Sequence, residues 1–514
     1  MDVVDTGLWN IAREQPDLTA VVDPSGREID YRTLAQDADR YGQGLRRLGL
    51  SVGDVVVVML PNGIELLALY FAALECGFYI VPINWHLTGP EVAYIVEDSE
   101  AKAFVAHERF GDAATVAAAA LPGETRFAVG ELAGFRPLAE LADGSGRPDS
   151  RTLGAPMVYT SGTTGKPKGV KRPLTGVSPD AVPVASSAFF AIFGITPFDD
   201  HVHICGSPLY HTAVLNFVGI SIQLGHTAVL MERFDAEEML RLIERHRVTH
   251  SHMVPTQFTR LLALPEGVRE KYDVSSLRAM IHGAAPCPDE VKRAMLDWWG
   301  PVVIEYYAAT EGGGASITAT EWLTKPGSVG KAWPYSVIKI LDDHGEEVAT
   351  GETGLVYMKM GQSNFDYHKS EQKTRESRVG DLFTVGDIGY LDEDGYLYLC
   401  DRKSDMIISG GVNVYPAEIE SELVMHPAVA DVAVFGVPDE QWGETIKAVV
   451  QPAEGVEPSE QLTADINAFA AARLARYKLP KIVEYIDVLP RDDNGKLYKR
   501  KLRDPSWAGR AKAI

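Results

Sequence analysis

Residues 159–170 have the composition of a loop that binds phosphate groups. The segment reads YTSGTTGKPKGV, with three glycines, two lysines and four serine or threonine hydroxyls. Glycine permits close backbone approach to a ligand, while hydroxyls, N–H groups and lysines satisfy phosphate oxygens. The segment is not a Walker A loop, because Pro167 follows Gly165-Lys166 where that pattern needs serine or threonine. A glycine-rich loop alone is as often a plain turn, so the interpretation depends on the whole segment.

Asp387 and Lys496 lie in two further segments that suit a nucleotide. Asp387 lies in TVGDIGY, where its carboxylate can accept hydrogen bonds from both ribose hydroxyls. An aspartate between glycines is otherwise a common turn former. Lys496 follows Asn494-Gly495, a strong hairpin signal that predicts a lysine at the tip of a turn. Such a lysine is a solvated surface charge unless a neighbouring domain presents a cleft to it.

Six segments together resemble the motifs of the adenylate-forming superfamily, which includes acyl-CoA synthetases, adenylation domains of peptide synthetases and beetle luciferases. They are residues 159–170, 283–286 (GAAP), 305–311 (EYYAATE), 384–390 (TVGDIGY), 401–411 (DRKSDMIISGG) and 490–500 (PRDDNGKLYKR). The resemblance covers nearly the whole chain. It implies a ligase that converts a carboxylic acid and ATP to an acyl-adenylate and pyrophosphate, and then transfers the acyl group to a thiol. The implied cofactors are ATP, Mg²⁺ and coenzyme A.

The resemblance implies catalytic roles for four residues. Thr310 would contact the α-phosphate and Glu311 would hold Mg²⁺. Lys496 would bridge the carboxylate and the α-phosphate. His211, in the segment SPLYHT, is the candidate for the aromatic gate of related CoA ligases, with a packed core histidine as the alternative. The expected metal ligands are Glu311 and Thr160.

The resemblance also implies which residues bind the nucleotide and the coenzyme. Asp387 would hold the ribose, and Arg402 would reach the ribose or the phosphates. The glycines at 410 and 411 fit a loop beside the pantetheine arm. Tyr477 would stack on the adenine of coenzyme A, and Lys481 would meet one of its phosphates. The full expected set is Thr160, Ser161, Gly162, Thr163, Thr164, Gly165, Lys166, Lys168, Gly283, Ala284, Ala285, Tyr307, Asp387, Arg402, Gly410, Gly411, Tyr477 and Lys481.

The segment that would line the acyl site indicates the kind of acid. Relatives that activate amino acids need a carboxylate there for the substrate's ammonium group, and residues 207–223 contain no Asp or Glu. We therefore expect an apolar acid without an α-amino group. Three glycines at 312–314 suggest room beside the carboxylate for a bulky or alicyclic acid.

The elements that must position these motifs alternate between strand and helix. Buried strands are expected at 55–60, 227–231, 248–253 and 277–282, and helices at 64–76, 236–246 and 288–299. This alternation predicts an α/β fold with mainly parallel sheets layered with helices. After residue 400 the pattern changes to a small α+β unit. We expect an N-terminal adenylation domain at 1–403 and a mobile C-terminal domain at 404–514, which rotates about a hinge at 402–405.

Composition restricts the setting in which the chain works. The net charge is −22, from 49 Lys and Arg against 71 Asp and Glu, which disfavours nucleic acid and anionic membrane surfaces as partners. Four widely spaced cysteines and no apolar N-terminal segment predict a reduced cytoplasmic protein, and no apolar run is long enough for an integral membrane span. The expected partners are a small carboxylic acid, ATP and coenzyme A, and a homodimer is left open.

Three alternatives remain at this point. The chain could load the phosphopantetheine of a carrier protein in place of coenzyme A, although an acidic surface slows the approach of an acidic carrier. It could be an inactive relative that only binds ligands, which the presence of Lys496, Glu311, Asp387 and Arg402 disfavours. It could be a luciferase-like oxygenase, for which the sequence contains no positive sign.

Overall fold

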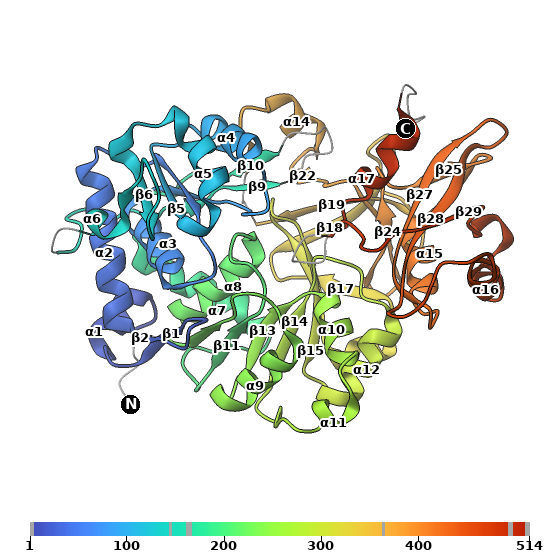
Figure 1. Ribbon diagram of the computed structural model, residues 1–514, viewed down its shortest axis with the longest axis horizontal. Coiled ribbons are helices and arrows are strands. Elements are labelled where there is room, and N and C mark those ends of the chain that lie inside the picture. Colours follow the sequence, from blue (N-terminus) through green and yellow to red (C-terminus); the bar gives the residue numbers. More distant parts are fainter. Residues whose placement is uncertain (1–4, 143–145, 161–166, 362–364, 492–496, 509–514) are drawn as a thin grey trace.

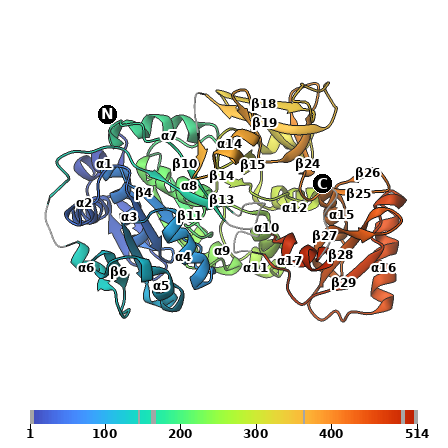
Figure 2. The ribbon, with the colours of Figure 1, turned by 90° about the horizontal axis from the view of Figure 1, so that it is seen from above.

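The computed structural model describes residues 5–142, 146–160, 167–361, 365–491 and 497–508. A large N-terminal domain with parallel sheets precedes a small C-terminal domain, which lies at the right in Figure 1 and Figure 2. The predicted α/β class is confirmed. Within the described residues, no helix combines the length and the apolar character needed to cross a membrane.

A parallel sheet near the N-terminus has helices on both faces. Its order is β7-β6-β5-β3-β4-β8, with β3 (Val55–Met59), β4 (Tyr79–Pro82), β5 (Ala103–His107), β6 (Arg126–Val129), β7 (Arg136–Pro137) and β8 (Ala155–Pro156). The helices of this region are α1 (Leu8–Glu14), α2 (Tyr31–Arg47), α3 (Ile64–Cys76), α4 (Gly89–Asp98), α5 (Gly111–Ala117) and α6 (Leu138–Leu141). Val56 packs with α2 and α3, whereas Val57 packs with α4 and α5. Strand residues alternate in direction, so a continuous apolar run buries both faces.

A second sheet positions the residues of the candidate active site. Its parallel strands follow the order β1-β12-β11-β13-β14-β15, with β2 antiparallel at the edge. They are β1 (Thr19–Val22), β2 (Glu28–Asp30), β11 (Val202–Cys205), β12 (Thr227–Leu230), β13 (His250–Met253), β14 (Ala279–His282) and β15 (Val303–Ala308). The helices around it are α7 (Val182–Ala191), α8 (Thr212–Gln223), α9 (Ala236–His246), α10 (Pro255–Leu262), α11 (Glu266–Arg269), α12 (Asp289–Trp299) and α13 (Ala319–Thr324). Helices α9, α10 and α12 pack on one face and α7 and α8 on the other.

The second sheet continues into antiparallel strands that lie next to the C-terminal domain. They are β16 (Gly314–Ile317), β17 (Ser328–Ala332), β18 (Ser336–Leu341), β19 (Gly354–Met360), β21 (Arg378–Val379), β22 (Leu382–Phe383), β23 (Asp387–Leu391) and β24 (Leu397–Arg402). A small sheet of β9 (Val158–Thr160), β10 (Lys168–Lys171) and β20 (Asp366–Tyr367) brackets the glycine-rich segment, and α14 (Glu371–Glu376) follows it. Pairing of β10 with both β9 and β20 therefore brings residues near 160 and 370 together.

The C-terminal domain has its own sheet and core. Its strands are β25 (Ile407–Ser409), β26 (Val412–Val414), β27 (Val429–Asp439), β28 (Gly443–Pro452) and β29 (Ile482–Tyr485), and its helices are α15 (Pro416–Leu423), α16 (Glu460–Ala471) and α17 (Lys499–Arg503). Residues from α15, α16, β27 and β28 form a hydrophobic cluster of their own. The small domain therefore carries a separate core, as a rotating domain requires.

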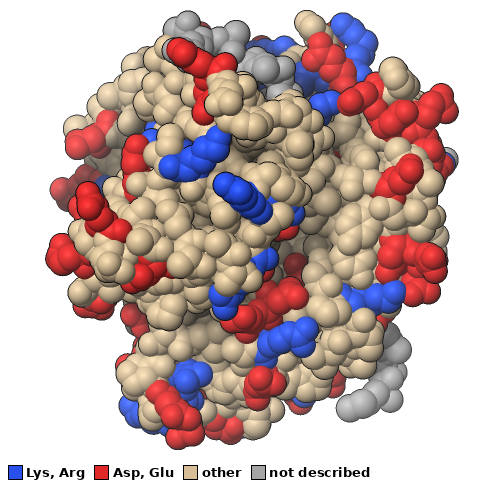
Figure 3. Space-filling view, turned by 90° about the vertical axis from the view of Figure 1, so that its right-hand side faces the viewer, with Lys and Arg blue, Asp and Glu red and all other residues tan. Residues whose placement is uncertain are grey.

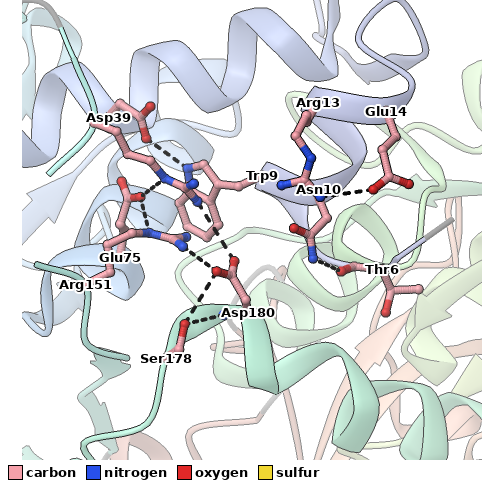
Figure 4. A network of polar contacts seen from close by, with 11 residues as sticks. Thr6, Trp9, Asn10, Arg13, Glu14, Asp39, Glu75, Arg151, Ser178 and Asp180 are labelled. Atoms are coloured by element: carbon pink, nitrogen blue, oxygen red, sulfur yellow. Dashed lines mark hydrogen bonds and ion pairs between the residues drawn. The ribbon is translucent and has the colours of Figure 1, made fainter. Parts of the chain in front are cut away.

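A buried polar network anchors the segment that leads into α7. The Glu75 carboxylate on α3 is fully buried and accepts hydrogen bonds from Arg147, at 3.0 Å, and from Arg151, at 2.5 Å. Arg151 also pairs with Asp180 at 2.5 Å, and Figure 4 shows these side chains grouped around Trp9. Burial raises the pKa of Glu75 to about 8. The network connects residues far apart in sequence and holds the turn that precedes α7.

Candidate active site

Carboxyl ends of the parallel strands of the second sheet face a cleft between the two domains. Residues just after β11, β12, β13, β14 and β15 line it, as expected for ligand sites of open α/β sheets. Of the expected site residues, the cleft gathers Thr310, Glu311, His211, Ala284, Ala285, Tyr307, Asp387 and Arg402. These residues come from separate segments, so only the fold brings them together.

Glu311 and Thr310 follow β15 at the end of the cleft nearest the glycine-rich segment. The Glu311 side chain is buried, and its Oε1 accepts a hydrogen bond from the Tyr367 hydroxyl at 2.6 Å. The Thr310 carbonyl accepts one from Arg172 Nη2 at 2.6 Å. A carboxylate oxygen is a donor that Mg²⁺ prefers, so Glu311 fits the predicted metal role.

Cationic side chains lie around Glu311. The Nζ of Lys168 on β10 donates to Ser370 Oγ at 3.1 Å. The pKa of Lys373 on α14 is lowered, first by burial and next by the charge of Lys168. Burial likewise lowers the pKa of Arg172, while Glu311 opposes that shift. This arrangement offers positive charge to the phosphates of a nucleotide.

Sequence reasoning missed Arg172, Lys373 and Tyr367. Arg172 follows β10 directly, so its nearness to the glycine-rich segment was a usable signal. Tyr367 and Lys373 come near Glu311 because β20 pairs with β10, and nothing in their local sequence indicates that pairing.

Several predicted residues lie outside the part that the structure describes, namely Ser161, Gly162, Thr163, Thr164, Gly165, Lys166 and Lys496. Their neighbours are described. Thr160 ends β9 and pairs in register with Lys168 of β10. Arg491 forms an isolated antiparallel bridge with Leu497, and both residues line the cleft.

Asp387 is the centre of a hydrogen-bonded group on neighbouring strands. Its Oδ2 accepts a hydrogen bond from the Tyr307 hydroxyl at 2.6 Å, and its Oδ1 lies 3.3 Å from Arg402 Nε. Burial, and then the charge of Asp387, raise the pKa of Tyr307 well above its usual value. Its neighbour Tyr306 lies on the opposite face of the strand, in a hydrophobic cluster with Phe193 and Trp333, as the alternation of strand residues predicted.

The turn after β14 is built for close backbone approach. A Cβ added at Gly283 would lie 2.7 Å from the Tyr306 carbonyl oxygen, so no larger residue fits there. Ala284 has φ 67°, in the left-handed region that favours glycine. Ala284 and Ala285 line the cleft, whereas Gly283 lies behind them. Strain at a non-glycine residue of this kind is typical of ligand-binding turns.

Replacing Asp387 with asparagine should weaken ATP binding without unfolding the chain. The amide keeps the size of the carboxylate but offers a single acceptor oxygen and no charge to Arg402. A hydrogen bond to a charged group contributes about 1.5–3 kcal/mol, so we expect the KM for ATP to rise about 10- to 100-fold. Isothermal titration with ATP and steady-state kinetics measure this. An unchanged ATP affinity would contradict the assigned role.

His211 lies immediately before α8 and lines the cleft. Its ring centroid is 4.5 Å from that of Tyr210, whose ring in turn meets Trp85 edge-on at 4.6 Å. Its place in the lining is compatible with the predicted gate. The gate role of His211, with a packed core histidine as its alternative, stays a prediction.

The four residues expected on the coenzyme side lie away from this cleft. Gly410, Gly411, Tyr477 and Lys481 are absent from its described lining. The Gly410 N–H donates to the Trp442 carbonyl at 2.8 Å, and Lys481 Nζ lies 5.0 Å from the centre of the Trp442 ring. These residues therefore gather on the small domain.

Fold and site together define a two-domain nucleotide-binding enzyme with an adjoining apolar cleft. Residues 8–365 match the AMP-binding enzyme family, and residues 418–496 match the AMP-binding enzyme C-terminal domain. The chain therefore belongs to the AMP-binding enzyme family, within the adenylate-forming superfamily, and both the predicted superfamily and the predicted enzyme class are confirmed.

Relatives and solved structures align over almost the whole chain. The fatty acid–[acyl-carrier-protein] ligase ScoC of Streptomyces coeruleorubidus is 33% identical, covering 98% of this chain and 96% of that protein. The long-chain-fatty-acid–CoA ligase FadD13 of Mycobacterium tuberculosis is 35% identical, covering 96% of each. The structure of o-succinylbenzoate CoA synthetase (MenE) of Bacillus subtilis superposes with a TM-score of 0.82 at 28% identity, covering 97% of each chain. All three are acid–thiol ligases by name.

Proposed function

We propose that this chain is an ATP-dependent acyl-CoA synthetase, which adenylates an apolar carboxylic acid without an α-amino group and passes the acyl group to coenzyme A. The observation that carries the proposal is a single cleft that joins a nucleotide-type set, Asp387, Tyr307 and Glu311, to an aromatic gate at His211. The similar proteins support an acid–thiol ligase, since a relative named as a CoA ligase and one named as a carrier-protein ligase both align over almost the whole chain.

ATP and a carboxylate are both anions, so the site must position them and offset their repulsion. Lys168, Arg172 and Lys373 would face the phosphates. Glu311 would hold Mg²⁺, which when bound neutralises phosphate charge. Lys496 would stabilise charge on the carboxylate and α-phosphoryl oxygens as the acyl-adenylate forms. Arg491 and Leu497, the described residues on either side of the segment that holds Lys496, line the cleft.

Thiol transfer would require the small domain to turn. We place the domain boundary at 403/404, with the hinge at 402–405. Arg402 pairs with Asp387 at 3.3 Å and Lys403 with Asp343 at 2.7 Å, both on the large domain. Rotation about these residues would withdraw Lys496 and bring Gly410 and Gly411 toward the cleft.

The cellular setting is also a proposal. Cys76, Cys205, Cys287 and Cys400 carry free thiols, which suits a reduced cytoplasmic compartment. Figure 3 shows acidic side chains spread over the face that carries the small domain, with Lys and Arg side chains among them. This charge is unfavourable for the approach of an acidic carrier protein.

The test is an assay of the two half-reactions. Purified protein is incubated with ATP, Mg²⁺ and fatty, aromatic, steroid-like and terpenoid acids, with and without coenzyme A. We expect acid-dependent pyrophosphate release and AMP release that depends on coenzyme A. Pyrophosphate release that coenzyme A does not stimulate would point to a carrier-protein acceptor. If no acid gives pyrophosphate release, the result would favour an inactive relative that only binds its ligands.

A further inference from the structure

The small sheet of β9, β10 and β20 connects helix α4 to the phosphate side of the cleft. Tyr159 on β9 pairs in register with Gly169 on β10. Val170 of β10 pairs with Tyr367 of β20, and the His368 N–H, next along the chain, donates to the Gly169 carbonyl at 2.8 Å. Tyr159, Gly169 and His368 therefore lie in one row across the three strands, and their side chains share one face of the sheet.

The middle position of this row needs a glycine. A Cβ added at Gly169 would lie 2.5 Å from Met157 Cε and 3.2 Å from the Tyr159 ring. Because Gly169 has no side chain, the side chains of Tyr159 and His368 on the outer strands can both reach the end of α4. The Tyr159 ring also packs against the hydrophobic cluster of the first sheet, to which α4 belongs.

Asp98, the last residue of α4, accepts hydrogen bonds from both outer strands. Its Oδ2 accepts from the Tyr159 hydroxyl at 2.7 Å. Its backbone carbonyl accepts from His368 Nε2 at 2.9 Å and from Lys369 Nζ at 2.8 Å. Carbonyl groups at the C-terminal end of a helix have no partner within the helix, and the helix dipole favours cations there. One residue thus fixes the strand that enters the glycine-rich segment and the segment that follows β20.

The backbone is strained where these two segments meet. Lys369 has φ 51° and Glu100 has φ 58°, both in the left-handed region that disfavours a side chain. Lys369 Nζ also lies 3.1 Å from Glu100 Oε1, but both side chains are exposed, and an exposed ion pair contributes little. Strain of this kind persists only where surrounding contacts hold it, and it concentrates at functional sites. The contacts with Asp98 are the ones that hold it here.

The opposite face of the small sheet carries the groups of the phosphate site. The Tyr367 hydroxyl donates to Glu311 Oε1 at 2.6 Å, and Lys168 Nζ donates to Ser370 Oγ at 3.1 Å. Lys373 Nζ lies 4.6 Å from the centre of the Tyr367 ring. Successive strand residues point to opposite faces, so the row that contacts Asp98 and the row that contacts Glu311 belong to one rigid unit. A shift of the small sheet relative to α4 would displace all of these groups together.

We propose that Asp98 is a positioning residue for adenylation, which holds the small sheet through Tyr159 and His368 so that Tyr367, Lys168 and Lys373 stay in place around Glu311. This inference rests on the proposed acyl-CoA synthetase function. Asp98 itself lies at the end of α4 and does not touch the reacting atoms. The role concerns the β- and γ-phosphates and the Mg²⁺ expected on Glu311, and therefore only the first half-reaction.

The test measures nucleotide binding and both half-reactions in variants that break these hydrogen bonds. Tyr159→Phe removes one donor and His368→Ala removes the other. By isothermal titration in the presence of Mg²⁺, we expect each variant to bind α,β-methylene-ATP, which cannot release pyrophosphate, about tenfold more weakly than the wild type. Acid-dependent pyrophosphate release should fall by a similar factor. Thiolysis of supplied acyl-adenylate should change by less than about threefold, because the adenylate has no β- or γ-phosphate.

Matched variants separate positioning from a general loss of structure. Asp98→Ala should reproduce the effect of Tyr159→Phe, and the double variant should be no worse, because both changes break the same bond. Asp98→Asn keeps an acceptor oxygen and His368→Gln keeps an N–H donor, so both should stay within about threefold of the wild type. Tyr272→Phe removes a tyrosine–carboxylate bond of 2.8 Å to Glu237, away from the described lining of the cleft, and should leave every rate unchanged.

The outcomes distinguish this inference from the proposed function. Wild-type binding of the analogue in Tyr159→Phe and His368→Ala, or equal losses in adenylation and thiolysis, would overturn the positioning role and leave the synthetase assignment intact. Additive losses in the Asp98→Ala, Tyr159→Phe double variant would also overturn it. A wild-type protein that neither binds the analogue nor releases pyrophosphate with any acid would count against the synthetase assignment and this inference together.

Discussion

Replacing Lys496 with alanine is expected to reduce acid-dependent pyrophosphate release about 10²- to 10³-fold. The variant would lose the cation that offsets charge on the carboxylate and α-phosphoryl oxygens, and one such donor contributes roughly 3–4 kcal/mol to transition-state stabilisation. The effect should fall on kcat more than on the KM for ATP, because the interaction strengthens as the new bond forms. Measuring pyrophosphate release under saturating ATP and acid tests this.

The same variant separates the two half-reactions. If the small domain rotates between them, Lys496→Ala should convert supplied acyl-adenylate and coenzyme A to thioester at nearly the wild-type rate. Lys271→Ala, at an exposed lysine on the large domain, is the matched control and should leave both rates unchanged. Equal losses in adenylation and thiolysis would refute the division of labour between the two domain positions.

Acidification below about pH 6.5 is expected to destabilise the large domain steeply. Five buried histidines must remain neutral in the folded chain. Burial lowers the pKa of His203 and His226 to about 3 and of His252 to about 4, and it places those of His250 and His282 well below the usual value. The rings of His203 and His250 share a hydrogen-bond partner in the Ser221 hydroxyl, at 2.7 and 2.9 Å.

The direction of this pH effect on stability follows from the number of protons that the folded and unfolded chains bind. Between the unfolded value near 6.5 and the lowered folded values, the unfolded chain binds protons that the folded chain does not. Stability is therefore present above pH 6.5 and is lost as the pH falls. Each histidine contributes a slope of up to about 1.4 kcal/mol per pH unit. Urea unfolding at pH 7, 6 and 5, followed by circular dichroism, measures the combined slope.

Single histidine variants separate the contributions of individual rings to the pH dependence of the free energy of unfolding. His203→Gln removes one titrating group, so its free energy of unfolding should approach that of the wild type as the pH falls from 7 to 5. His344→Gln replaces an exposed histidine on the surface and should show the same pH dependence as the wild type. A free energy of unfolding that stays level between pH 7 and pH 5 in the wild type would show that the buried rings accept protons without cost.

Local signals in the sequence predicted several elements closely. Helices expected at 64–76 and 236–246 are observed as α3 (Ile64–Cys76) and α9 (Ala236–His246). Gly77 ends α3 with φ 76°, and the Asp235 side chain caps α9 by accepting from the Glu238 N–H. Such end signals act over three or four residues, so they can be recognised without the fold.

Strand ends were predicted less well. The strand expected at 248–253 begins at His250. Pairing partners decide where a strand ends: β27 runs on because it stays in register with β28 from Val429 to Asp439. Arg151 lies in a polar stretch of the sequence, yet its side chain is 12% exposed and pairs with Glu75, because contacts with a distant segment bury it.

The sequence by itself determined the superfamily, the fold class and most residues expected at the nucleotide, because motifs of glycine, hydroxyl and charged residues encode phosphate and ribose chemistry over short spans. Only the tertiary structure decided which distant residues join them. Tyr367 reaches Glu311 through the pairing of β20 with β10. Contacts between segments that are far apart in the sequence depend on how the whole domain packs. A local sequence pattern contains no information about that packing.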